Sequence, residues 1–588
     1  MSGVSIAERS RLSWLSLRRG VDHVAGRLRA HPLARLPFIA GRSERLLIAP
    51  QDLRTADPTR ASEIYGGRFA FAGKIVICDG RSPFEMTPPS EDWAEALLGF
   101  GWLRHLRAAE SGITRANARA LVEEWIALQG SWHSLAWRPE ILSQRIIAWL
   151  THAPLILDDV DVVFYRTFLR TLTRQVRYLR STAGDARDGV RRLQARIALT
   201  YAALCLSGQR QHLRRAARAL VAELERQVLP DGGHISRNPG ALVELMLDLL
   251  PLRQVFAAGN VPPPSALLNA IDRIMPMLRF FRHGDGRFAL FNGMGPTHPD
   301  LLATILAYDD TYGAPLANAP YSGYQRLEAG RTIIIVDTGR PPPVDLSREA
   351  HAGCLSFELS TTHRIIVNSG APEIGKANWR DVARATAAHS TATLNNTSSC
   401  RFLGAQRLLF GNPIVQGPTH VEVGREVHDK GLSLRTSHDG YLRRFGLVHQ
   451  RSLSLSADGT RLDGEDVFYP GESGARPATK RDEFAVRFHL NPEIRATRQD
   501  DGRSVILVLP NKDVWNFSAH EHEVTLEEGV YLAGQDGPRR THQLVISGRT
   551  RKSPRVVWSL TQASLPQRET RAATTEPERT LSRSATRV

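Results

Sequence analysis

Cysteine is scarce in this sequence. Its four cysteines lie far apart and form no CxxC pair: Cys78, Cys205, Cys354 and Cys400. This spacing excludes a cysteine metal cluster and argues against a disulfide framework. Cys205 falls within the apolar helical pattern LTYAALCL, so we expect it in a hydrophobic core.

Long apolar runs are absent as well. No stretch approaches the roughly 20 apolar residues that span a bilayer, so we expect no transmembrane segment. The N-terminal residues lack the apolar core and small-residue cleavage site of a secretory signal, because arginines interrupt their apolar stretches. The default prediction is therefore a cytoplasmic protein.

Segment 10–30 has an amphipathic pattern. Leu17, Val21, Val24 and Leu28 share one helical face, opposite several arginines. A helix of this kind docks on its own protein or lies on a membrane surface. We predict the first, and peripheral membrane contact is the alternative.

Acidic residues are outnumbered by basic ones. The chain has 76 Lys and Arg against 60 Asp and Glu, a formal net charge of +16. Such a protein binds nucleic acid, anionic lipid or acidic polysaccharide, or only carries an arginine-rich surface, and net charge does not distinguish these cases. No recognised nucleic-acid-binding motif accompanies the charge, so no nucleic-acid partner is expected.

A helical pattern covers residues 90–310. Apolar residues recur at three- and four-residue spacing in segments such as EDWAEALLGFGWLRHLRAA, VVFYRTFLRTLTRQVRYLRS and GALVELMLDLLPLRQVF. The connections are short, and each helical hairpin needs neighbours to cover its apolar face. This organisation predicts an α/α toroid or a solenoid, which we assign to residues 51–318.

After about residue 320 the apolar period changes to two. GRTIIIVDTG, HRIIVNSG, EFAVRFHL and SVILVLP are short strands separated by Gly, Asn, Asp and Pro. Many strands without intervening helices predict an antiparallel β-sandwich, over residues 319–564. The fold class is thus α+β multidomain, with an N-terminal linker segment (1–50) and a disordered basic tail (565–588).

The stretch LPDGGHISRNPGALVELMLDLLPLR (229–253) joins a turn to an apolar helix. Asn238 and Pro239 fit the N-cap and the first helical position. His234 and Arg237 lie in the polar loop before the helix N-terminus, where an anion is favoured and an arginine can grip a carboxylate. They are either surface-loop residues or part of a binding site, and we predict a site.

Two histidines of the strand half share a predicted orientation. His351 has the parity of Phe357 on an expected strand, and His389 has the parity of Thr391 and Thr393 on a later one. We expect both to face one space, either as hydrogen-bonded core histidines or as metal ligands.

Six motifs in fixed order carry a family resemblance: DGGHISRNPGALVEL, HAGCLSFEL, RIIVNSGAP, ATAAHSTATLNNTSS, SHDGYLRRFGLVHQRSLSL and VRFHL. Over about residues 50–560 the sequence resembles the bacterial heparinase II/III-like family. The resemblance implies a toroid joined to a sandwich, and lyase activity on an acidic, uronate-containing polysaccharide in the cleft between them. Since glycan-degrading relatives are commonly exported, it also implies a periplasmic location as the alternative.

The implied reaction is β-elimination. One group neutralises the uronate carboxylate, a base removes the adjacent proton, and an acid protonates the departing oxygen. In well-known members a toroid Asn or Asn-His pair, a toroid tyrosine and a sandwich histidine do this. By position, the pair falls at Val190-Arg191, the tyrosine at Ala241 and the histidine at Glu349.

The resemblance also implies a structural zinc. Its two histidines and one aspartate correspond to His351, His389 and Asn368. A neutral amide is a weaker zinc ligand than a carboxylate, so zinc is an open expectation.

If the protein is a lyase, other residues take the vacant roles. His234 titrates near neutral pH, Tyr441 supplies a phenol, and Glu349 accepts a proton if its surroundings raise its pKa. The predicted catalytic residues are His234, Arg237, Tyr441 and Glu349. The predicted substrate-binding residues are Arg191, Asn238, His283, His438 and Arg443. The alternative is a glycan-binding or polysaccharide-assembly protein that kept the scaffold and lost the chemistry.

Overall fold

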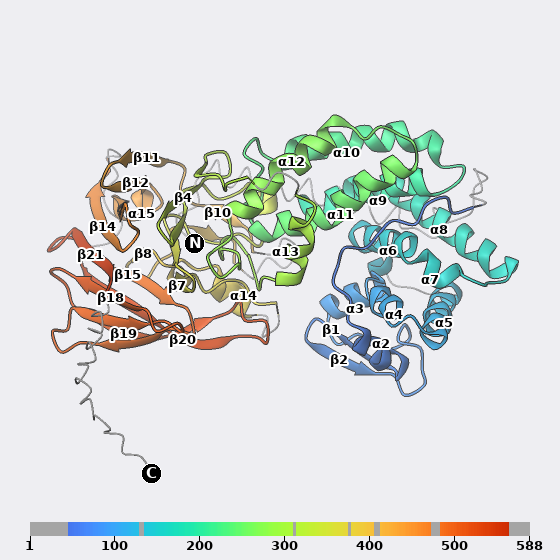
Figure 1. The fold of residues 1–588 in the computed structure, drawn as a ribbon, viewed down its shortest axis with the longest axis horizontal. Coiled ribbons are helices and arrows are strands. Elements are labelled where there is room, and N and C mark those ends of the chain that lie inside the picture. The colour runs from blue at the N-terminus through green and yellow to red at the C-terminus, as the bar shows by residue number, and fades with distance from the viewer. Residues whose placement is uncertain are drawn as a thin grey trace, which may run out of the picture.

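The structure, a computed structural model, describes residues 45–128, 134–309, 313–373, 378–404, 412–471 and 482–563. The predicted fold is confirmed: a helical half precedes a half of antiparallel sheets, and the two lie side by side (Figure 1). The helix predicted in segment 10–30 and the tail predicted at 565–588 fall outside the described residues. Of the described helices, none has the length and apolar character needed to cross a membrane.

The helical half forms the toroid. Its helices are α2 (Pro58–Tyr65), α3 (Glu91–Leu98), α4 (Leu103–Ala108), α5 (Gly112–Leu128), α6 (Pro139–Thr151), α7 (Ala153–Leu157), α8 (Val162–Thr182), α9 (Val190–Cys205), α10 (Leu213–Gln227), α11 (Pro239–Ala258), α12 (Ser265–Phe280) and α13 (Pro299–Leu306).

Packing in the toroid is centred on α9 and α11. α9 contacts α6, α10 and α11, and α11 also contacts α12 and α13. Cys205 at the end of α9 is fully buried, as predicted. A short hairpin, β1 (Arg68–Phe71) and β2 (Lys74–Ile77), also belongs to this half. The sequence did not predict it, because four-residue strands show too little alternation to be recognised beside helices.

The N-terminus of α11 has the predicted cap. Asn238 is the N-cap, its Oδ1 accepts a hydrogen bond from the Gly240 N–H at 2.8 Å, and Pro239 takes the first helical position. Asparagine side chains satisfy an unpaired N–H at this point, and proline has none to leave unpaired. The chain therefore enters α11 at a fixed angle, which sets the loop before it.

The strand half contains β3 (Asn318–Ala319), β4 (Tyr324–Ala329), β5 (Thr332–Asp337), β6 (Phe357–Ser360), β7 (Arg364–Val367), β8 (Ala392–Leu394), β9 (Arg401–Phe402), β10 (Ile414–Gln416), β11 (Val421–His428), β12 (Gly431–His438), β13 (Leu447–Ser456), β14 (Arg461–Pro470), β15 (Glu483–Leu490), β16 (Arg495–Arg498), β17 (Ser504–Val508), β18 (Val514–Ala519), β19 (Val524–Tyr531), β20 (Arg539–Arg549) and β21 (Arg555–Gln562). Short helices α14 (Asn378–Ala383) and α15 (Leu442–Phe445) lie between strands.

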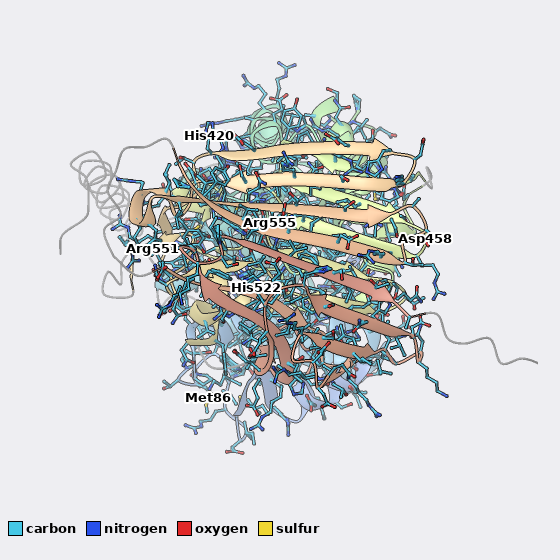
Figure 2. The ribbon with its side chains drawn as sticks, turned by 90° about the vertical axis from the view of Figure 1, so that its left-hand side faces the viewer. Met86, His420, Asp458, His522, Arg551 and Arg555 are labelled. Carbon is cyan, nitrogen blue, oxygen red and sulfur yellow. The ribbon has the colours of Figure 1, made fainter. Side chains whose placement is uncertain are left out.

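These strands form two large sheets. One has the order β11-β12-β13-β14-β21-β18-β17-β16, and Figure 2 looks onto its outer face. The other has the order β19-β20-β15-β7-β6-β5-β4-β3, with β8 also paired to β15. Along β13 every second residue is buried from His449 to Leu455, as the period of two requires. The sheets meet at Phe357, Phe488, Phe517 and Trp558, where the Phe488 and Trp558 ring centroids are 4.7 Å apart.

Arg237 joins the two halves. Its Nη2 lies 2.5 Å from Asp337 Oδ1, and its Nε donates to the Ser322 carbonyl at 2.8 Å. The guanidinium lies over the Tyr324 ring, whose hydroxyl donates to the Arg237 carbonyl at 2.6 Å. Burial alone would lower the pKa of Arg237, but the Asp337 carboxylate holds it above its ordinary value. This buried pair fixes the loop before α11 against the start of the sandwich.

The predicted strand positions of the two histidines are wrong. β6 begins at Phe357, so His351 lies in the loop before it, where Leu355 has a positive φ of 61°. His389 follows a 3-10 turn (Thr386–Ala388) and precedes β8. The alternation that predicted the strands starts later than His351, because the backbone turns at Leu355.

Candidate functional site

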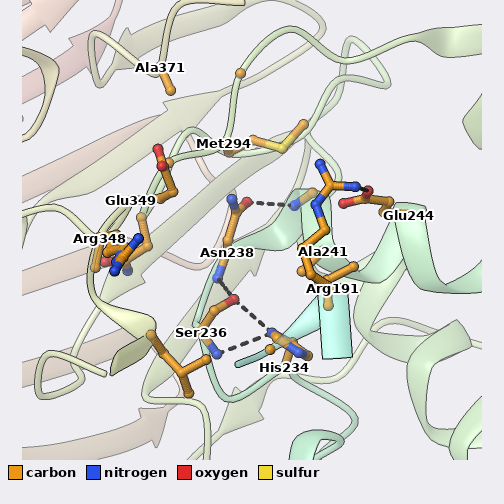
Figure 3. Close-up of a pocket in the computed structure, with 18 of the residues that line it drawn as sticks. Arg191, His234, Ser236, Asn238, Ala241, Glu244, Met294, Arg348, Glu349 and Ala371 are labelled. Carbon is orange, nitrogen blue, oxygen red and sulfur yellow. Dashed lines mark hydrogen bonds and ion pairs between the residues drawn. The ribbon is translucent and has the colours of Figure 1, made fainter. Parts of the chain in front are cut away.

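A cleft of about 1020 Å³ lies between the toroid and the sandwich. The toroid side contributes the start of α9 and the first half of α11, and the sandwich side contributes the loop around residues 345–351. The loop of residues 292–298, between α12 and α13, also lines the cleft. Figure 3 shows Asn238 between Arg191 on one side and Glu349 on the other.

Gly293 brings the two walls together. Its φ of +92° is a conformation that favours glycine, and a Cβ there would lie 2.8 Å from the Glu349 carbonyl and 3.3 Å from Asn238 Nδ2. A side chain at this position would push Glu349 and Asn238 apart. The glycine therefore keeps the cleft narrow at the point where they meet.

Asn238 and Arg191 present hydrogen-bond donors to the cleft. Asn238 uses Oδ1 for the cap, and no described residue accepts a hydrogen bond from its Nδ2. Arg191 Nη1 is 3.2 Å from Gln194 Oε1 and 3.4 Å from Glu244 Oε1, and its side chain is 37% exposed. The guanidinium is thus held in place by Glu244 while remaining accessible to a ligand.

His234 lies in the cleft wall, but both of its ring nitrogens have hydrogen-bond partners within the protein. Nδ1 accepts from the Ser236 N–H at 3.1 Å and is 2.7 Å from Ser236 Oγ, while Nε2 is 3.0 Å from Gln227 Oε1. With Nδ1 as acceptor, the ring proton sits on Nε2 and is donated to Gln227. Burial lowers the pKa of His234 to about 4, so the ring is neutral at pH 7.

His351 and His389 do face one space, although not from strands. His389 Nδ1 lies 2.8 Å from the Ala385 carbonyl and therefore carries the proton. Its Nε2 then accepts from His351 Nδ1 at 3.0 Å, which leaves the second nitrogen of His351 unprotonated. His351 lines the cleft, so an imidazole lone pair is held beside it.

Five predicted catalytic and substrate-binding residues lie outside the cleft lining. Arg237 holds the halves together as described, and Tyr441 is fully buried, with its hydroxyl donating to the Ala392 carbonyl at 2.8 Å. Burial raises the pKa of Tyr441. His283 contacts Ser360 and Glu358 of β6 inside the protein, and His438 is buried with Nδ1 accepting from the Gly440 N–H.

Arg443 is exposed on α15, also outside the cleft lining. Sequence reasoning placed these groups near a site because each is polar and lies beside a turn. The structure instead uses the buried ones to join elements, and turn signals do not distinguish the two roles.

The cleft carries both signs of charge, with two more carboxylates than guanidinium groups. No tyrosine occurs among the described residues that line it. The charged run DARDGVRR at the start of α9 was the signal for many of these groups, and sequence reasoning used only Arg191. The arginines are Arg187, Arg191, Arg192, Arg348, Arg380 and Arg384, and the carboxylates are Asp92, Glu95, Asp185, Asp188, Glu244, Asp345, Glu349 and Glu373.

Two sequence matches to known proteins identify the family of this chain. Residues 311–559 match the domain family Heparinase II/III-like, C-terminal. FtsZ-localized protein C of Caulobacter vibrioides is 32% identical over 541 residues, covering 90% of this chain and 92% of that protein. The chain belongs to the heparinase II/III-like family.

Solved structures agree with the heparinase II/III-like fold. The crystal structure of heparinase III has a TM-score of 0.66 at 14% identity, covering 89% of this chain and 87% of that one. A mutant of heparan sulfate lyase HepC from Pedobacter heparinus has a TM-score of 0.62 at 15% identity, covering 89% and 86%. At these identities the similarity concerns the fold alone.

The zinc position of the heparinase II/III-like family is altered here. His351 and His389 are hydrogen-bonded to each other, and Asn368 Oδ1 accepts from the Ser390 N–H at 2.9 Å. Asn368 Nδ2 is buried without a partner. The described residues contain no group of three or more His, Cys, Asp or Glu that could hold a metal ion. As arranged, this set does not fit zinc, and we derive no step through a metal.

Proposed function

We propose that this protein is a glycan-binding member of the heparinase II/III-like family that acts together with FtsZ and has lost the family's β-elimination. The relative from Caulobacter vibrioides, named for its localisation with FtsZ, shares nearly the whole length of the chain. That extent of similarity supports a shared cellular setting. The cleft supports a glycan as the ligand.

The observation that carries the proposal is the lining of the cleft. Its volume, about 1020 Å³, is at the upper end of the range for ligand sites, about 300–1,000 Å³. Ala241 occupies the position expected for the family tyrosine, and Glu349 that of the histidine. His234 has both ring nitrogens engaged within the protein. The cleft keeps donors that bind sugars, whereas the tyrosine and the histidine that transfer protons in the family are both replaced.

Binding rests on Arg191 and Asn238. Both offer N–H groups to the cleft, and Arg191 is oriented by Glu244 and Gln194. Because carboxylates outnumber guanidinium groups in the lining, a densely sulfated polyanion would meet repulsion as well as attraction. The proposed ligand is therefore a neutral or mixed-charge glycan.

Calorimetric titration of the full chain with a glycan panel tests binding. We expect Arg191→Ala to weaken the best ligand by about tenfold or more, the usual effect of losing a charge-assisted hydrogen bond. Arg166→Ala, on the exposed face of α8, is the control and should leave the affinity unchanged. The absence of binding to every glycan would overturn the proposal.

Co-sedimentation with polymerised FtsZ from the same organism tests whether the protein associates with FtsZ. We expect the protein in the pellet only when FtsZ polymerises. Recovery in the supernatant under both conditions, at protein concentrations up to the micromolar range, would refute this part of the proposal.

A relocated lyase centre is the second candidate. Glu349 and Arg191 line the same cleft, so a uronate carboxylate held by Arg191 would bring its ring near the Glu349 carboxylate. Glu349 would take the proton from the carbon next to the carboxylate as the C–C double bond forms and the glycosidic C–O bond breaks, and the departing oxygen would take a proton from water. The ultraviolet absorbance of unsaturated uronates measures this directly. An increase that Glu349→Gln abolishes would establish a lyase and refute the loss of chemistry.

A further inference from the structure

A second cavity, of about 270 Å³, lies inside the toroid. Glu244 and Leu247 of α11 line both this cavity and the cleft, so the two cavities adjoin at this helix. The remaining walls come from the segment before α2, from α2 itself with Arg60, from β1, and from α3, α4, α6 and α9. We call it the toroid chamber; its charged and polar lining includes Asp52, Arg54, Arg104, His105, Gln144 and Glu244.

Part of the chamber wall is internally neutralised. Arg54 Nη2 lies 2.8 Å from Asp248 Oδ1, and Gln194 Nε2 is 3.2 Å from the other oxygen of that carboxylate. Asp52 is 3.7 Å from Arg54 and 3.4 Å from His152 Nε2. Burial alone would lower the pKa of Arg54, but Asp248 and Asp52 hold it above the ordinary value. These groups satisfy one another and need no ligand.

Arg104 differs from this cluster. It lies on α4 in the chamber wall, and within the described parts of the chain no acceptor is in hydrogen-bond reach of its guanidinium and no carboxylate lies within 4 Å. Its interaction with Asp52 is electrostatic and longer in range. Burial lowers its pKa. Arg104 is partly exposed, so its guanidinium donors are open to a ligand, and a carboxylate accepts hydrogen bonds from two of them at once.

His105 adds a donor next to Arg104. Its Nδ1 accepts from the Asp57 N–H at 3.0 Å, and burial lowers its pKa to about 4, so the neutral ring carries its proton on Nε2. No described residue accepts that proton. Arg104 and His105 together present a set of donors suited to one carboxylate.

An acceptor of opposite charge lies at the junction with the cleft. The Glu244 side chain is 41% exposed, and its Oε1 lies 3.4 Å from Nη1 of Arg191 in the cleft wall. A ligand that occupies both cavities would lie against this carboxylate where they adjoin, with the Arg104 guanidinium on the chamber side. This arrangement suits a group with an N–H donor near the sugar and a carboxylate at its far end.

We infer that the toroid chamber binds an amino-acid substituent of a glycan held in the cleft, with its carboxylate on Arg104 and its N–H group toward Glu244. The inference rests on the proposed glycan-binding function and narrows the ligand to glycans that carry amino acids or short peptides. The small volume of the chamber admits one such substituent, while the sugar chain stays in the larger cleft.

Calorimetric titration with three probes tests this assignment on the full chain. N-acetylmuramyl dipeptide carries a sugar, amino-acid N–H groups and a carboxylate; chitotriose carries sugars alone; a glucuronate-containing disaccharide carries a carboxylate without an amino acid. We expect Arg104→Gln to raise the Kd for the muramyl dipeptide by about tenfold or more and to leave chitotriose unchanged.

Two further variants guard against misfolding. Ala96→Met, on α3 in the chamber wall, fills part of the chamber while Arg104 is retained, and it should weaken binding of the same probe. Arg166→Gln is the matched control, because this arginine is exposed on α8, lines neither cavity and should not affect binding. Thermal unfolding of each variant reports its folding. Equal affinities for the muramyl dipeptide in wild type, Arg104→Gln and Ala96→Met would overturn the inference.

The remaining outcomes separate this inference from the function on which it rests. If the glucuronate disaccharide loses as much affinity as the dipeptide in Arg104→Gln, the chamber is a general carboxylate site and the amino-acid assignment is wrong. If other glycans bind in an Arg191-dependent way and the muramyl dipeptide does not bind, the inference fails and the proposed function stands. If none of the glycans binds, the proposed function itself fails.

Discussion

Arg237 combines backbone strain with full use of its side chain. Its φ of 63° lies in the left-handed region, which a residue other than glycine adopts at a cost. The guanidinium contacts Asp337 and three backbone carbonyls: those of Ser322, Gly323 and Arg340. The contacts of the side chain hold the backbone in a conformation that the loop would otherwise leave.

Removing this side chain should destabilise the protein strongly. Arg237→Ala leaves the Asp337 carboxylate buried without its cation, and we expect a loss of about 3–5 kcal/mol in the free energy of unfolding. Urea denaturation measures it. Arg166→Ala on the surface of α8 should change the same quantity by about 0.5 kcal/mol or less. Equal stability of the two variants would contradict the bridging role of Arg237.

Acid should destabilise the protein through His234. The folded protein holds its pKa at about 4, mainly by burial, while the unfolded value is near 6.5. The unfolded chain therefore takes up a proton first, so stability is constant above pH 6.5 and falls as the pH decreases toward 4. Replacing His234 by Gln should reduce the loss of unfolding free energy between pH 7.5 and pH 5 by about 2 kcal/mol. An unchanged pH profile in urea titrations would count against a neutral, buried His234.

At the scale of single elements, α11 has two functions. It begins at the Asn238 cap, it is buried on most sides, and it lines both the cleft and the toroid chamber. Asn238 serves the helix with Oδ1 and faces the cleft with Nδ2. Substitutions that retain one of these atoms can therefore separate stability from ligand binding.

We expect Asn238→Asp to keep the cap and Asn238→Ala to lose it. The alanine variant should unfold about 1 kcal/mol more easily, the usual cost of losing an N-cap side chain. The aspartate variant should keep most of that stability, yet bind glycan as weakly as the alanine variant, because it lacks the Nδ2 donor. Calorimetric titration and urea denaturation of both variants give the comparison. Wild-type binding by Asn238→Asp would exclude a role for Nδ2.

The sequence predicted those elements whose signals are local. The cap at Asn238 and the helical face of α11 follow from neighbouring residues, and so does the change to strands after residue 320. The family positions at His351 and His389 were predicted to converge, and they do. The hydrogen-bond partners of a buried polar side chain could not be predicted from the sequence. Arg237 and Tyr441 sit beside turns, and only the tertiary fold shows that their partners are inside the protein.

At the scale of the whole molecule, the loop after α12 ties the toroid to the sandwich a second time. His283 and the Gly284 N–H both contact Ser360 Oγ of β6. A Cβ on Gly284 would lie 1.6 Å from the Thr361 carbonyl oxygen, a distance that forces the two halves apart. Together with Arg237, this contact predicts that the halves unfold together.

We therefore expect one calorimetric unfolding transition in the wild type. Gly284→Ala should lower its midpoint, with a loss of about 1–3 kcal/mol from overpacking. Gly112→Ala is the matched control, because a Cβ there meets no atom within 4 Å. Two separate transitions in the wild type would show that the halves are independent, contrary to the docking described above.

The cleft is built from segments more than 150 residues apart in the chain, from Arg191 in α9 to Glu349 before β6. A molecule bound there acts as an additional cross-link between halves that share one unfolding event. By mass action it raises the melting temperature in proportion to the logarithm of its concentration relative to its Kd. Unlabelled compounds can thus be ranked by heating alone, with no assay of turnover.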